Sequence, residues 1–453
     1  MPGHRDEIAT CLAVLARLDD TGLDAADRQR LERAVTAAAR GIKRRAKSRR
    51  GTESRDADRA LLATATRFHT ELPDPALHVP APPAVGVVGT LRRARRCYVC
   101  KTAYRDVDAD YHLMCAACAD RNRAHRYART DLTGHSALVT GGRVKIGFHT
   151  ALKLLRDGAE VTVTTRFPRD AARRYAALPD FPDWAGRLTV YGLDLLDLSA
   201  VLDFVELARR RPGGLDILVN NAAQTLHRPA AYHREVRAAE NAPLPEPAAR
   251  LMVSAASGTT TAPAGRVALS PAMHDALFPA ALTDETGQQL DLRATNSWVL
   301  RDTDVSPQEW LQVHVVNAFA PFLLTSRLRP LLAASPHSRR HVVQVSAMEG
   351  SFSRNAKTIR HPHTNMAKAS LNMLVRTVAA DYARDGILMN AVDTGWVTDE
   401  RPHPRKQAQR SSGFRPPLDV IDGAARVYHP IIAAGRGEPF VGQFLKDYRS
   451  VPW

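Results

Sequence analysis

The sequence predicts an α/β fold built on a doubly wound parallel sheet. A strand, a glycine turn and a helix follow one another between Ser136 and Arg156. The β-branched apolar run of the strand ends at Gly141 and Gly142, and apolar residues then return at helical spacing. Such a turn lets a phosphate group approach the backbone, and the start of the helix offers free N–H groups. The stretch is therefore predicted to open a dinucleotide-binding unit.

Alternation of strands and helices after Leu132 is the second observation behind this fold class. The further strands are expected over residues 160–165, 188–193, 215–220, 341–346 and 387–392. Because helical patterns separate these short apolar runs, the strands should be parallel and covered by helices on both faces. Residues 224–304 are too long for an ordinary connection, so they are expected to be a lid, an added subdomain or a partly disordered loop.

The length of 453 residues is enough for two or three domains. We expect a helical region over residues 1–70, a proline-rich linker over 71–92 and a cysteine-containing knuckle over 93–131. A large domain should follow over residues 132–453, with a long insertion at about 224–304. Since neither a secretory signal nor an apolar run of bilayer length is readable, we expect a cytoplasmic protein without a membrane-spanning segment.

Positive charge is concentrated in the front part of the chain. The net charge is +16, and residues 1–131 carry 25 Lys and Arg against 17 Asp and Glu. This region could bind a nucleic acid or an acidic protein. The alternative is that these charged side chains simply lie on solvent-exposed helix faces. The basic run Lys43–Arg50 is interpreted as a solvated helix end.

Four of the five cysteines form two C-x-x-C pairs, Cys97 with Cys100 and Cys115 with Cys118. Fourteen residues separate the pairs. Thiolates at this spacing can meet around one tetrahedral ion, so a structural zinc is predicted. All four ligands would come from the protein, which leaves no open position for catalysis at the metal.

Several short motifs then follow the expected strands in a fixed order. Asn220-Asn221-Ala222-Ala223 follows the fourth strand of the large domain, and Asn317, Lys368 and Gly395 come later. From Leu132 to Gln443 the chain thereby resembles the short-chain dehydrogenase/reductase family, which has a Rossmann-type sheet. The resemblance implies an oxidoreductase with a small-molecule substrate, which could form a homo-oligomer through the family's helices. It implies a cofactor site made of Thr140, Gly141, Gly142, Arg143, Lys145, Ile146, Gly147, Arg166, Asp194, Leu195, Asn221, Ala222, Lys368, Gly395 and Thr398.

Four positions depart from the family pattern. Lys145 stands at the middle glycine of the cofactor turn, and Ala223 replaces the last glycine of the sheet motif. Ala347 occupies the position of the catalytic serine, with Ser346 beside it, and Thr364 occupies that of the catalytic tyrosine. An aliphatic hydroxyl is a much weaker acid than a phenol, so Thr364 cannot simply take over proton transfer.

Two histidines near Lys368 are candidate replacements for the missing tyrosine. His361 lies seven residues before Lys368, a spacing that resembles the enoyl-reductase branch of the family, and His363 lies closer. An imidazole has a pKa suited to proton transfer. The alternative is a surface loop that happens to be rich in histidine. The candidate catalytic residues are Asn317, Ser346, His361, His363, Thr364 and Lys368.

The residues after the second strand of the large domain favour NADP over NAD. Arg166 follows this strand, where the family places an acid for the ribose hydroxyl of NAD or a basic residue for the 2′-phosphate of NADP. Lys145 adds a second cation. Two functions remain open: an NADP-dependent oxidoreductase with an atypical active site, and a catalytically inactive NADP-binding protein that acts as a regulatory or macromolecule-binding module.

Overall fold

The structure is a computed structural model in which the chain divides into two compact units. It describes residues 3–17, 24–69, 86–253, 271–284, 287–354 and 357–453. The larger unit comprises residues 62–90 and 94–453, and the smaller one comprises residues 1–61 and 91–93.

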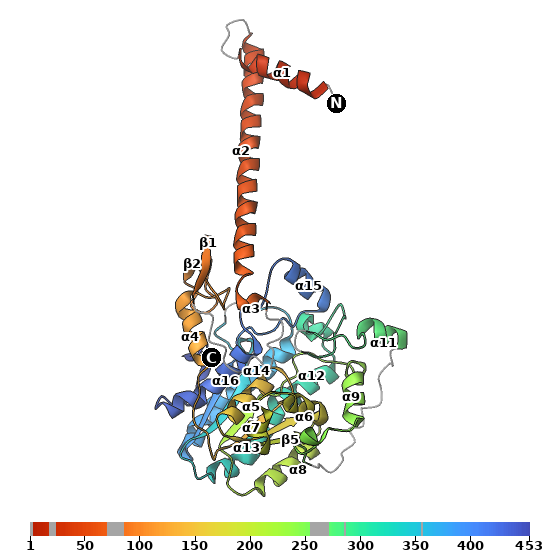
Figure 1. The fold of residues 1–453 in the computed structure, drawn as a ribbon, viewed down its shortest axis with the longest axis vertical. Coiled ribbons are helices and arrows are strands. Elements are labelled where there is room, and N and C mark those ends of the chain that lie inside the picture. The colour runs from red at the N-terminus through yellow and green to blue at the C-terminus, as the bar shows by residue number, and fades with distance from the viewer. Residues whose placement is uncertain (1–2, 18–23, 70–85, 254–270, 285–286, 355–356) are drawn as a thin grey trace. The chain divides into compact units, whose positions relative to one another are not determined.

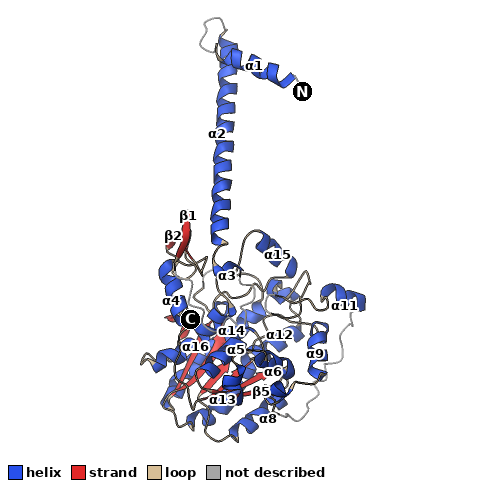
Figure 2. Ribbon diagram, viewed as in Figure 1, coloured by secondary structure: helices blue, strands red, loops and turns tan. Residues whose placement is uncertain are grey.

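An eight-stranded sheet forms the centre of the larger unit (Figures 1 and 2). Its order is β10-β9-β8-β7-β6-β3-β4-β5, and the neighbouring strands are parallel except for β9 and β10. The strands are β3 Ser136–Thr140, β4 Glu160–Thr165, β5 Leu188–Gly192, β6 Ile217–Asn220, β7 Arg340–Ser346, β8 Ile387–Asp393, β9 Phe444–Lys446 and β10 Arg449–Val451. The predicted α/β class with a parallel sheet is confirmed. The sequence pattern does not signal β9 and β10, because each has only three residues.

Helices cover both faces of this sheet, which is why its strands are apolar on both sides. One face packs against α5 Lys145–Arg156, α6 Pro168–Ala176, α7 Phe181–Trp184 and α16 Val420–Gly435. The other face packs against α8 Leu198–Arg209, α13 Ala320–Ala333 and α14 Pro362–Arg384. Helix α12 (Pro307–His314) leads into α13 through a π-helical turn, and α15 (His403–Ser411) follows β8.

The direction of winding reverses at β3, and this reversal positions the functional site. The chain builds β3, β4 and β5 toward one edge and then places β6 on the opposite side of β3. The connections that leave β3 and β6 therefore diverge to opposite faces. In sheets of this kind the divergence opens a crevice at the carboxyl ends of the strands, where ligands bind.

The long insertion carries short helices in its described part. They are the 3-10 helix Ala230–His233, α9 Arg234–Asn241, α10 Glu246–Ala249, α11 Pro271–Leu277, and 3-10 turns at Ser297–Val299 and Asp302–Asp304. Residues 254–270 and 285–286 of this segment lie outside the described residues. The backbone N–H groups of Arg169 and Asp170 donate to Glu240, and that of Val190 donates to the carbonyl of Leu251. The insertion is thereby attached to α6 and to the edge strand β5.

The smaller unit is helical and contains α1 (Gly3–Leu15) and most of α2 (Ala25–Leu62). The basic run Lys43–Arg50 lies in the middle of α2, so the expectation that it ends a helix is wrong. Nothing in the run breaks a helix, because Lys, Arg and Ala are good helix formers. Within the described part of the chain, no helix has both the length and the apolar character that a bilayer-spanning segment needs.

The cysteine-containing segment is an antiparallel hairpin followed by a helix. The hairpin pairs β1 (Val87–Arg96) with β2 (Ala103–Asp108), and α4 (Ala116–Arg126) comes next. Most of the expected linker, residues 71–85, lies outside the described residues, and β1 begins at Val87. A short helix, α3 (Thr66–His69), precedes that stretch.

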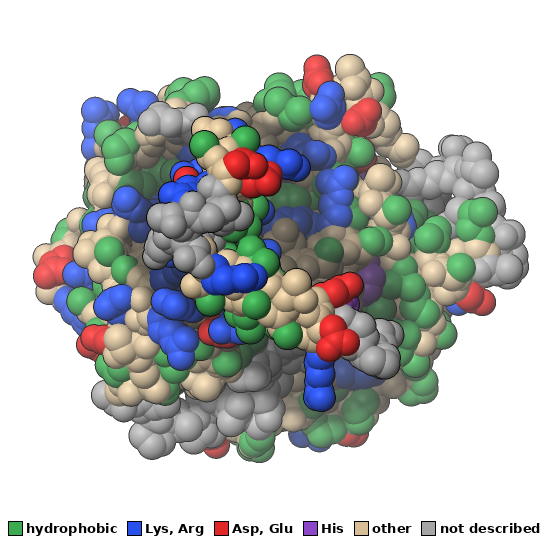
Figure 3. All heavy atoms as spheres, turned by 90° about the horizontal axis from the view of Figure 1, so that it is seen from above, with side chains coloured by type: hydrophobic (Ala, Val, Ile, Leu, Met, Phe, Trp, Pro, Cys, Tyr) green, Lys and Arg blue, Asp and Glu red, His purple; other side chains and the backbone are tan. Residues whose placement is uncertain are grey.

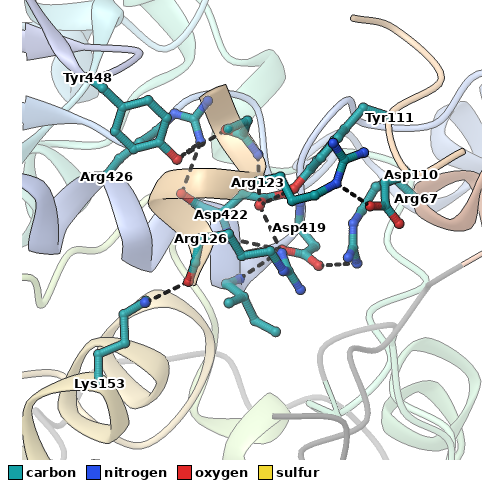
Figure 4. A network of polar contacts seen from close by, with 12 residues as sticks. Arg67, Asp110, Tyr111, Arg123, Arg126, Lys153, Asp419, Asp422, Arg426 and Tyr448 are labelled. Atoms are coloured by element: carbon teal, nitrogen blue, oxygen red, sulfur yellow. Dashed lines mark hydrogen bonds and ion pairs between the residues drawn. The ribbon is translucent and has the colours of Figure 1, made fainter. Parts of the chain in front are cut away.

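A buried network of polar contacts joins α4 to α16 (Figure 4). Arg126 of α4 donates to Asp419 at 2.7 Å and to Asp422 at 2.8 Å. These two carboxylates also form the capping box that starts α16. Tyr111 donates to Asp422 at 2.9 Å, and Arg67 donates to Asp419 at 2.5 Å. The cysteine-containing segment is therefore fixed to the helix that packs on α5.

Replacing Arg126 by alanine should lower the free energy of unfolding by about 3–5 kcal/mol, because it leaves Asp419 and Asp422 buried without their main partner. Urea denaturation followed by circular dichroism measures the loss. Arg121→Ala is the matched control, since Arg121 lies exposed on the same helix and should change the free energy by less than about 0.5 kcal/mol. Equal effects of the two substitutions would contradict a stabilising role for the network.

The same network should make stability depend on acid. Burial acts to raise the pKa of Asp419, but the nearby charges of Arg126 and Arg67 outweigh it, and the net effect is a lowered pKa. The stabilisation is therefore complete above the ordinary carboxyl pKa of about 4 and is lost as the pH falls below it. Denaturation midpoints below pH 4 should fall less steeply in Arg126→Ala than in the wild type.

Candidate active site

Gly141 in the turn after β3 and Gly147 in the first turn of α5 occupy positions that leave no room for a side chain. Gly141 has a positive φ of 70°, and a Cβ there would lie 2.9 Å from the Cα atom of Ala222. A Cβ on Gly147 would lie 2.3 Å from the side-chain nitrogen Nδ2 of Asn221 and 2.3 Å from the carbonyl oxygen of Gly141. The backbone can therefore approach a ligand closely at the start of α5, where free N–H groups attract an anion.

Lys145, at the first position of α5, adopts the left-handed conformation with φ of 55°. This conformation is strained for a residue with a side chain, which explains why glycine suits the position. The ammonium of Lys145 lies 3.3 Å from Glu400. Burial would raise the pKa of Glu400, but Lys145 and a hydrogen bond from Thr398 lower it to about 2. Lys145 is thus paired with a carboxylate across the turn.

A cavity of about 1650 Å³ lies at the carboxyl ends of the strands. Thirteen of its lining side chains are Lys or Arg, and six are Asp or Glu. Figure 3 shows Lys and Arg side chains gathered around a hollow on this face. The excess of positive charge favours an anionic ligand.

Most of the site residues predicted from the sequence line this one cavity. They are Gly141, Arg143, Lys145, Ile146, Gly147, Arg166, Asp194, Leu195, Asn221, Ala222, Ser346, His361, Thr364, Lys368, Gly395 and Thr398. Thr140, Gly142, Asn317 and His363 are not among the lining residues. Strands and loops far apart in the sequence thus bring one set of side chains together.

Three of the four residues outside the lining support its walls. The hydroxyl of Thr140 accepts the N–H groups of Asn221 and Ala222, each at 3.0 Å. A Cβ on Gly142 would lie 2.6 Å from Val163, so this glycine lets the turn pack on β4. Asn317 accepts the N–H of Gln224 at 2.6 Å and donates to its carbonyl at 3.1 Å, which fixes the start of the insertion.

Arg166 directly follows β4, where a ribose-binding acid would lie in an NAD site, and Arg143 of the turn after β3 lies near the same Phe167 ring. Arg166 is exposed, lines the cavity and lies with its guanidinium 5.5 Å from the ring centre of Phe167. Arg143 lines the same region and donates to Asp170 at 2.8 Å. The charge of Arg143 is therefore partly balanced, whereas Arg166 has no carboxylate partner among the residues that the structure describes.

Lys368 projects from α14 toward β7 and donates to the carbonyl oxygen of Val345 at 2.7 Å. Burial lowers the pKa of Lys368 to about 8. Ser346 lies at the end of β7, and its hydroxyl donates to the side-chain oxygen of Asn372 at 2.5 Å. The Ser346 proton is therefore already engaged within the protein.

Thr364 occupies the tyrosine position on α14 and has a free hydroxyl. It is buried and lines the cavity, and among the described side chains its oxygen is one of those without a hydrogen-bond partner. A buried hydroxyl without a partner is costly, so the position is suited to bonding a bound ligand.

The structure separates the two candidate histidines. His361 lines the cavity, stacks on Trp298 with ring centres 4.1 Å apart, and lies with Nδ1 3.0 Å from the side-chain oxygen of Asn365. Burial lowers the pKa of His361. His363 is buried away from the cavity lining, with Nε2 3.3 Å from Glu309. Of these two histidines, only His361 lines the cavity.

Several cavity residues were missed by sequence reasoning. Tyr98 and Lys101 come from the connection between β1 and β2, which carries Cys97 and Cys100, and Trp298 comes from the insertion. No spacing in the sequence connects these segments to the cofactor turn. Glu349 also lines the cavity and lies three residues after Ser346, so its position was a usable signal. It was missed because the family motifs have no acidic residue to match it.

The four paired cysteines form a compact cluster. Their Sγ atoms all lie within 4.8 Å of one another, and those of Cys100 and Cys115 are 3.7 Å apart. Tetrahedral zinc with bonds of about 2.3 Å needs sulfur atoms about 3.8 Å apart. The backbone N–H of Cys115 also donates to the sulfur of Cys97 at 3.4 Å. The donor set and its spacing fit one metal ion.

Comparisons with known proteins agree with this geometry. Residues 135–241 match the family described as short chain dehydrogenase, and residues 283–412 match the one described as enoyl-(acyl carrier protein) reductase. An uncharacterized protein of Acanthamoeba polyphaga mimivirus is 33% identical over 348 residues, 74% of this chain and 71% of the viral protein. Carbonyl reductase [NADPH] 1 of Sus scrofa is 37% identical over 99 residues, 21% of this chain and only 34% of that relative.

A solved structure of a dehydrogenase/reductase from Sinorhizobium meliloti 1021 is 18% identical to this chain. It covers 71% of this chain and 96% of its own length, with a TM-score of 0.46. The two family matches, together with the sheet order and the residues around the cavity, identify the class. The chain belongs to the short-chain dehydrogenase/reductase family, of which it is a divergent member.

Proposed function

We propose that the chain is an NADP-dependent oxidoreductase that transfers its proton without the tyrosine and serine usual in the family. The observation that carries the proposal is that Lys368, His361 and the unbonded hydroxyl of Thr364 line the same cavity as the glycine turn. Hydride transfer needs a bound nicotinamide, and the oxygen of the carbonyl group that accepts the hydride needs a proton. The cavity offers groups for both tasks.

The charge at the end of β4 supports NADP as the cofactor. Arg166 lines the cavity where a 2′-phosphate would lie, and no carboxylate stands at Thr165, Arg166 or Phe167 to bind a ribose hydroxyl. Lys145 is engaged by Glu400, so we assign the discrimination mainly to Arg166, with Arg143 beside it. One relative of part of this chain is named as an NADPH-dependent carbonyl reductase, which agrees with this choice.

Arg166→Ala should weaken NADPH binding about 10–100-fold, because a charge-assisted contact to the phosphate is worth roughly 1.5–3 kcal/mol. NADH binding should be unchanged, since NADH lacks that phosphate. Isothermal titration calorimetry measures both. Arg209→Ala, at the exposed end of α8, is the matched control. Equal affinity of the wild type for NADPH and NADH would contradict the assignment.

The proposed mechanism divides the chemistry between the cofactor and three side chains. When bound, NADPH would supply a hydride to the carbonyl carbon of the substrate. His361 in its protonated form gives a proton to the carbonyl oxygen, so the double bond becomes an alcohol. Thr364 orients that oxygen through its hydroxyl, and Ser346 is the less suited alternative because it already donates to Asn372. Lys368 would hold the cofactor ribose, and Asn317 fixes Gln224, which lines the cavity.

His361→Ala should lower kcat for carbonyl reduction by roughly 10²–10⁴ while NADPH affinity changes little, because a general acid is lost. His363→Gln is the control, since this ring contacts Glu309 outside the cavity lining. Steady-state kinetics with NADPH and a panel of aldehydes and ketones provides the measurement. Wild-type turnover in His361→Ala would exclude this residue as the proton donor.

The pH dependence supplies a second readout of the same step. Because burial lowers the pKa of His361, its protonated form is populated only below the ordinary histidine pKa of about 6.5. Reductive kcat should therefore rise as the pH falls below 6.5, and the residual rate of His361→Ala should lack this rise.

We also propose that Cys97, Cys100, Cys115 and Cys118 hold one structural zinc ion, since their sulfur atoms have the spacing of a closed tetrahedral site. Metal analysis of protein purified without chelator should give one zinc per chain. Cys118→Ser should lower the metal content and the melting temperature, because ligation contributes folding energy. Cys11→Ser, at the exposed free cysteine in α1, should change neither. Full stability and no metal in the wild type would contradict the site.

The second candidate function, an inactive NADP-binding module that engages a macromolecule, is favoured by α2. This helix carries 12 Lys and Arg against 5 Asp and Glu, and most of its described residues are exposed. A nucleic acid or an acidic protein could bind such a helix. NADPH binding without turnover of any carbonyl or enoyl substrate would favour this function over catalysis.

A homo-oligomer is proposed from the apolar side chains that the larger unit exposes on neighbouring helices. Phe322 on α13 and Met366 and Met373 on α14 are about half exposed. Phe319 precedes them on the π-helical turn and is similarly exposed. Such patches commonly mark contacts between chains. Light scattering should show a larger mass for the wild type than for Phe322→Glu.

A further inference from the structure

The connection between β1 and β2, which carries Cys97 and Cys100, reaches into the proposed cofactor cavity. Tyr98 and Lys101 line it together with Gly141 of the cofactor turn and Gly395 of the loop after β8. A Cβ on Gly395 would lie 3.3 Å from the hydroxyl of Tyr98, so the loop backbone passes close to this side chain. Part of the cysteine-containing segment is therefore a wall of the cavity.

A hydrogen bond connects this wall to the loop of residues 394–400. The hydroxyl of Tyr98 accepts the backbone N–H of Trp396 at 2.8 Å. The indole N–H of Trp396 in turn donates to the carbonyl of Thr398 at 3.1 Å. The conformation of the loop at Trp396 is thereby fixed by one backbone hydrogen bond and one side-chain hydrogen bond.

The contacts continue from this loop to the cofactor turn. The hydroxyl of Thr398 donates to Glu400 at 2.7 Å, and Glu400 pairs with Lys145 at 3.3 Å. Tyr98 and Lys145 thus hold opposite ends of the 394–400 loop. A ligand that lies between the glycine turn and this loop would have the cysteine-containing turn beside it.

We infer that Tyr98 is a positioning residue, which acts on the cofactor through the 394–400 loop. The cysteine cluster supports cofactor binding in turn, because it fixes the stretch of chain that carries Tyr98. This inference rests on the proposed binding of NADP. It assigns the cluster a role in the site as well as in folding. A metal ion between the cysteines would hold Cys97 and Cys100 on either side of Tyr98, and its loss would release the hydroxyl from Trp396.

The first experiment measures the loop without any cofactor. In Tyr98→Phe, hydrogen exchange of the Trp396 amide, followed by mass spectrometry of the peptide that contains it, should be about 3–10-fold faster, because the N–H loses its acceptor. Tyr104→Phe is the matched control. Its hydroxyl belongs to the same hairpin and donates to the carbonyl of His112 at 2.8 Å, outside the cavity lining.

The second experiment measures NADPH affinity by calorimetry in the same variants. Tyr98→Phe should bind NADPH about 3–10-fold more weakly with unchanged melting temperature and metal content, and Tyr104→Phe should match the wild type. Removing the metal with a chelator should weaken NADPH binding in the wild type but much less in Tyr98→Phe, because the two changes break the same link.

The outcomes separate this inference from the proposed function. Unchanged exchange at Trp396 in Tyr98→Phe would overturn the inference, and so would an equal loss of affinity in the two tyrosine variants. If the exchange responds as expected but the wild type binds no NADPH, the link from Tyr98 to the loop is upheld, while both the proposed function and the role of Tyr98 toward the cofactor are overturned.

Discussion

The ion pairs of Arg126 with Asp419 and Asp422 connect two parts of the chain that the sequence keeps almost 300 residues apart. Arg126 ends the helix that starts between Cys115 and Cys118, and the two carboxylates start α16, which packs on the cofactor helix α5. Because all three charges are buried, none of these elements can shift alone without leaving a charge unpaired. The cysteine cluster and the glycine turn therefore share one rigid support.

This support explains how the cavity can stay organised although side chains at several family positions differ. The features that would bind a cofactor are retained, since the glycine turn and Lys368 line one cavity with the 394–400 loop. The features that would move a proton are changed, with Thr364 at the tyrosine position and His361 beside it. Binding depends on backbone shape and on distributed positive charge, whereas proton transfer depends on single groups. The groups that transfer a proton can therefore change while cofactor binding is kept.

The sequence predicted the fold class and the parallel sheet because strand and helix periodicities and the order of motifs are local signals. It also placed Cys97 and its three partners, whose spacing is regular. It could not choose between His361 and His363, because the direction of each ring depends on Trp298 and Glu309 from distant segments. The contacts of Tyr98 with Trp396 and of Lys145 with Glu400 could not be predicted, because each joins residues that lie far apart in the sequence.

A crystal structure of the protein with NADPH tests the central claim, that one cavity walled by the glycine turn and the cysteine-containing turn binds the cofactor for hydride transfer. We expect the pyrophosphate at Gly141 and Gly147, the 2′-phosphate beside Arg166, and the nicotinamide between His361 and the 394–400 loop, with Tyr98 still bonded to Trp396. NADPH bound elsewhere, or with its nicotinamide turned away from His361, would contradict it.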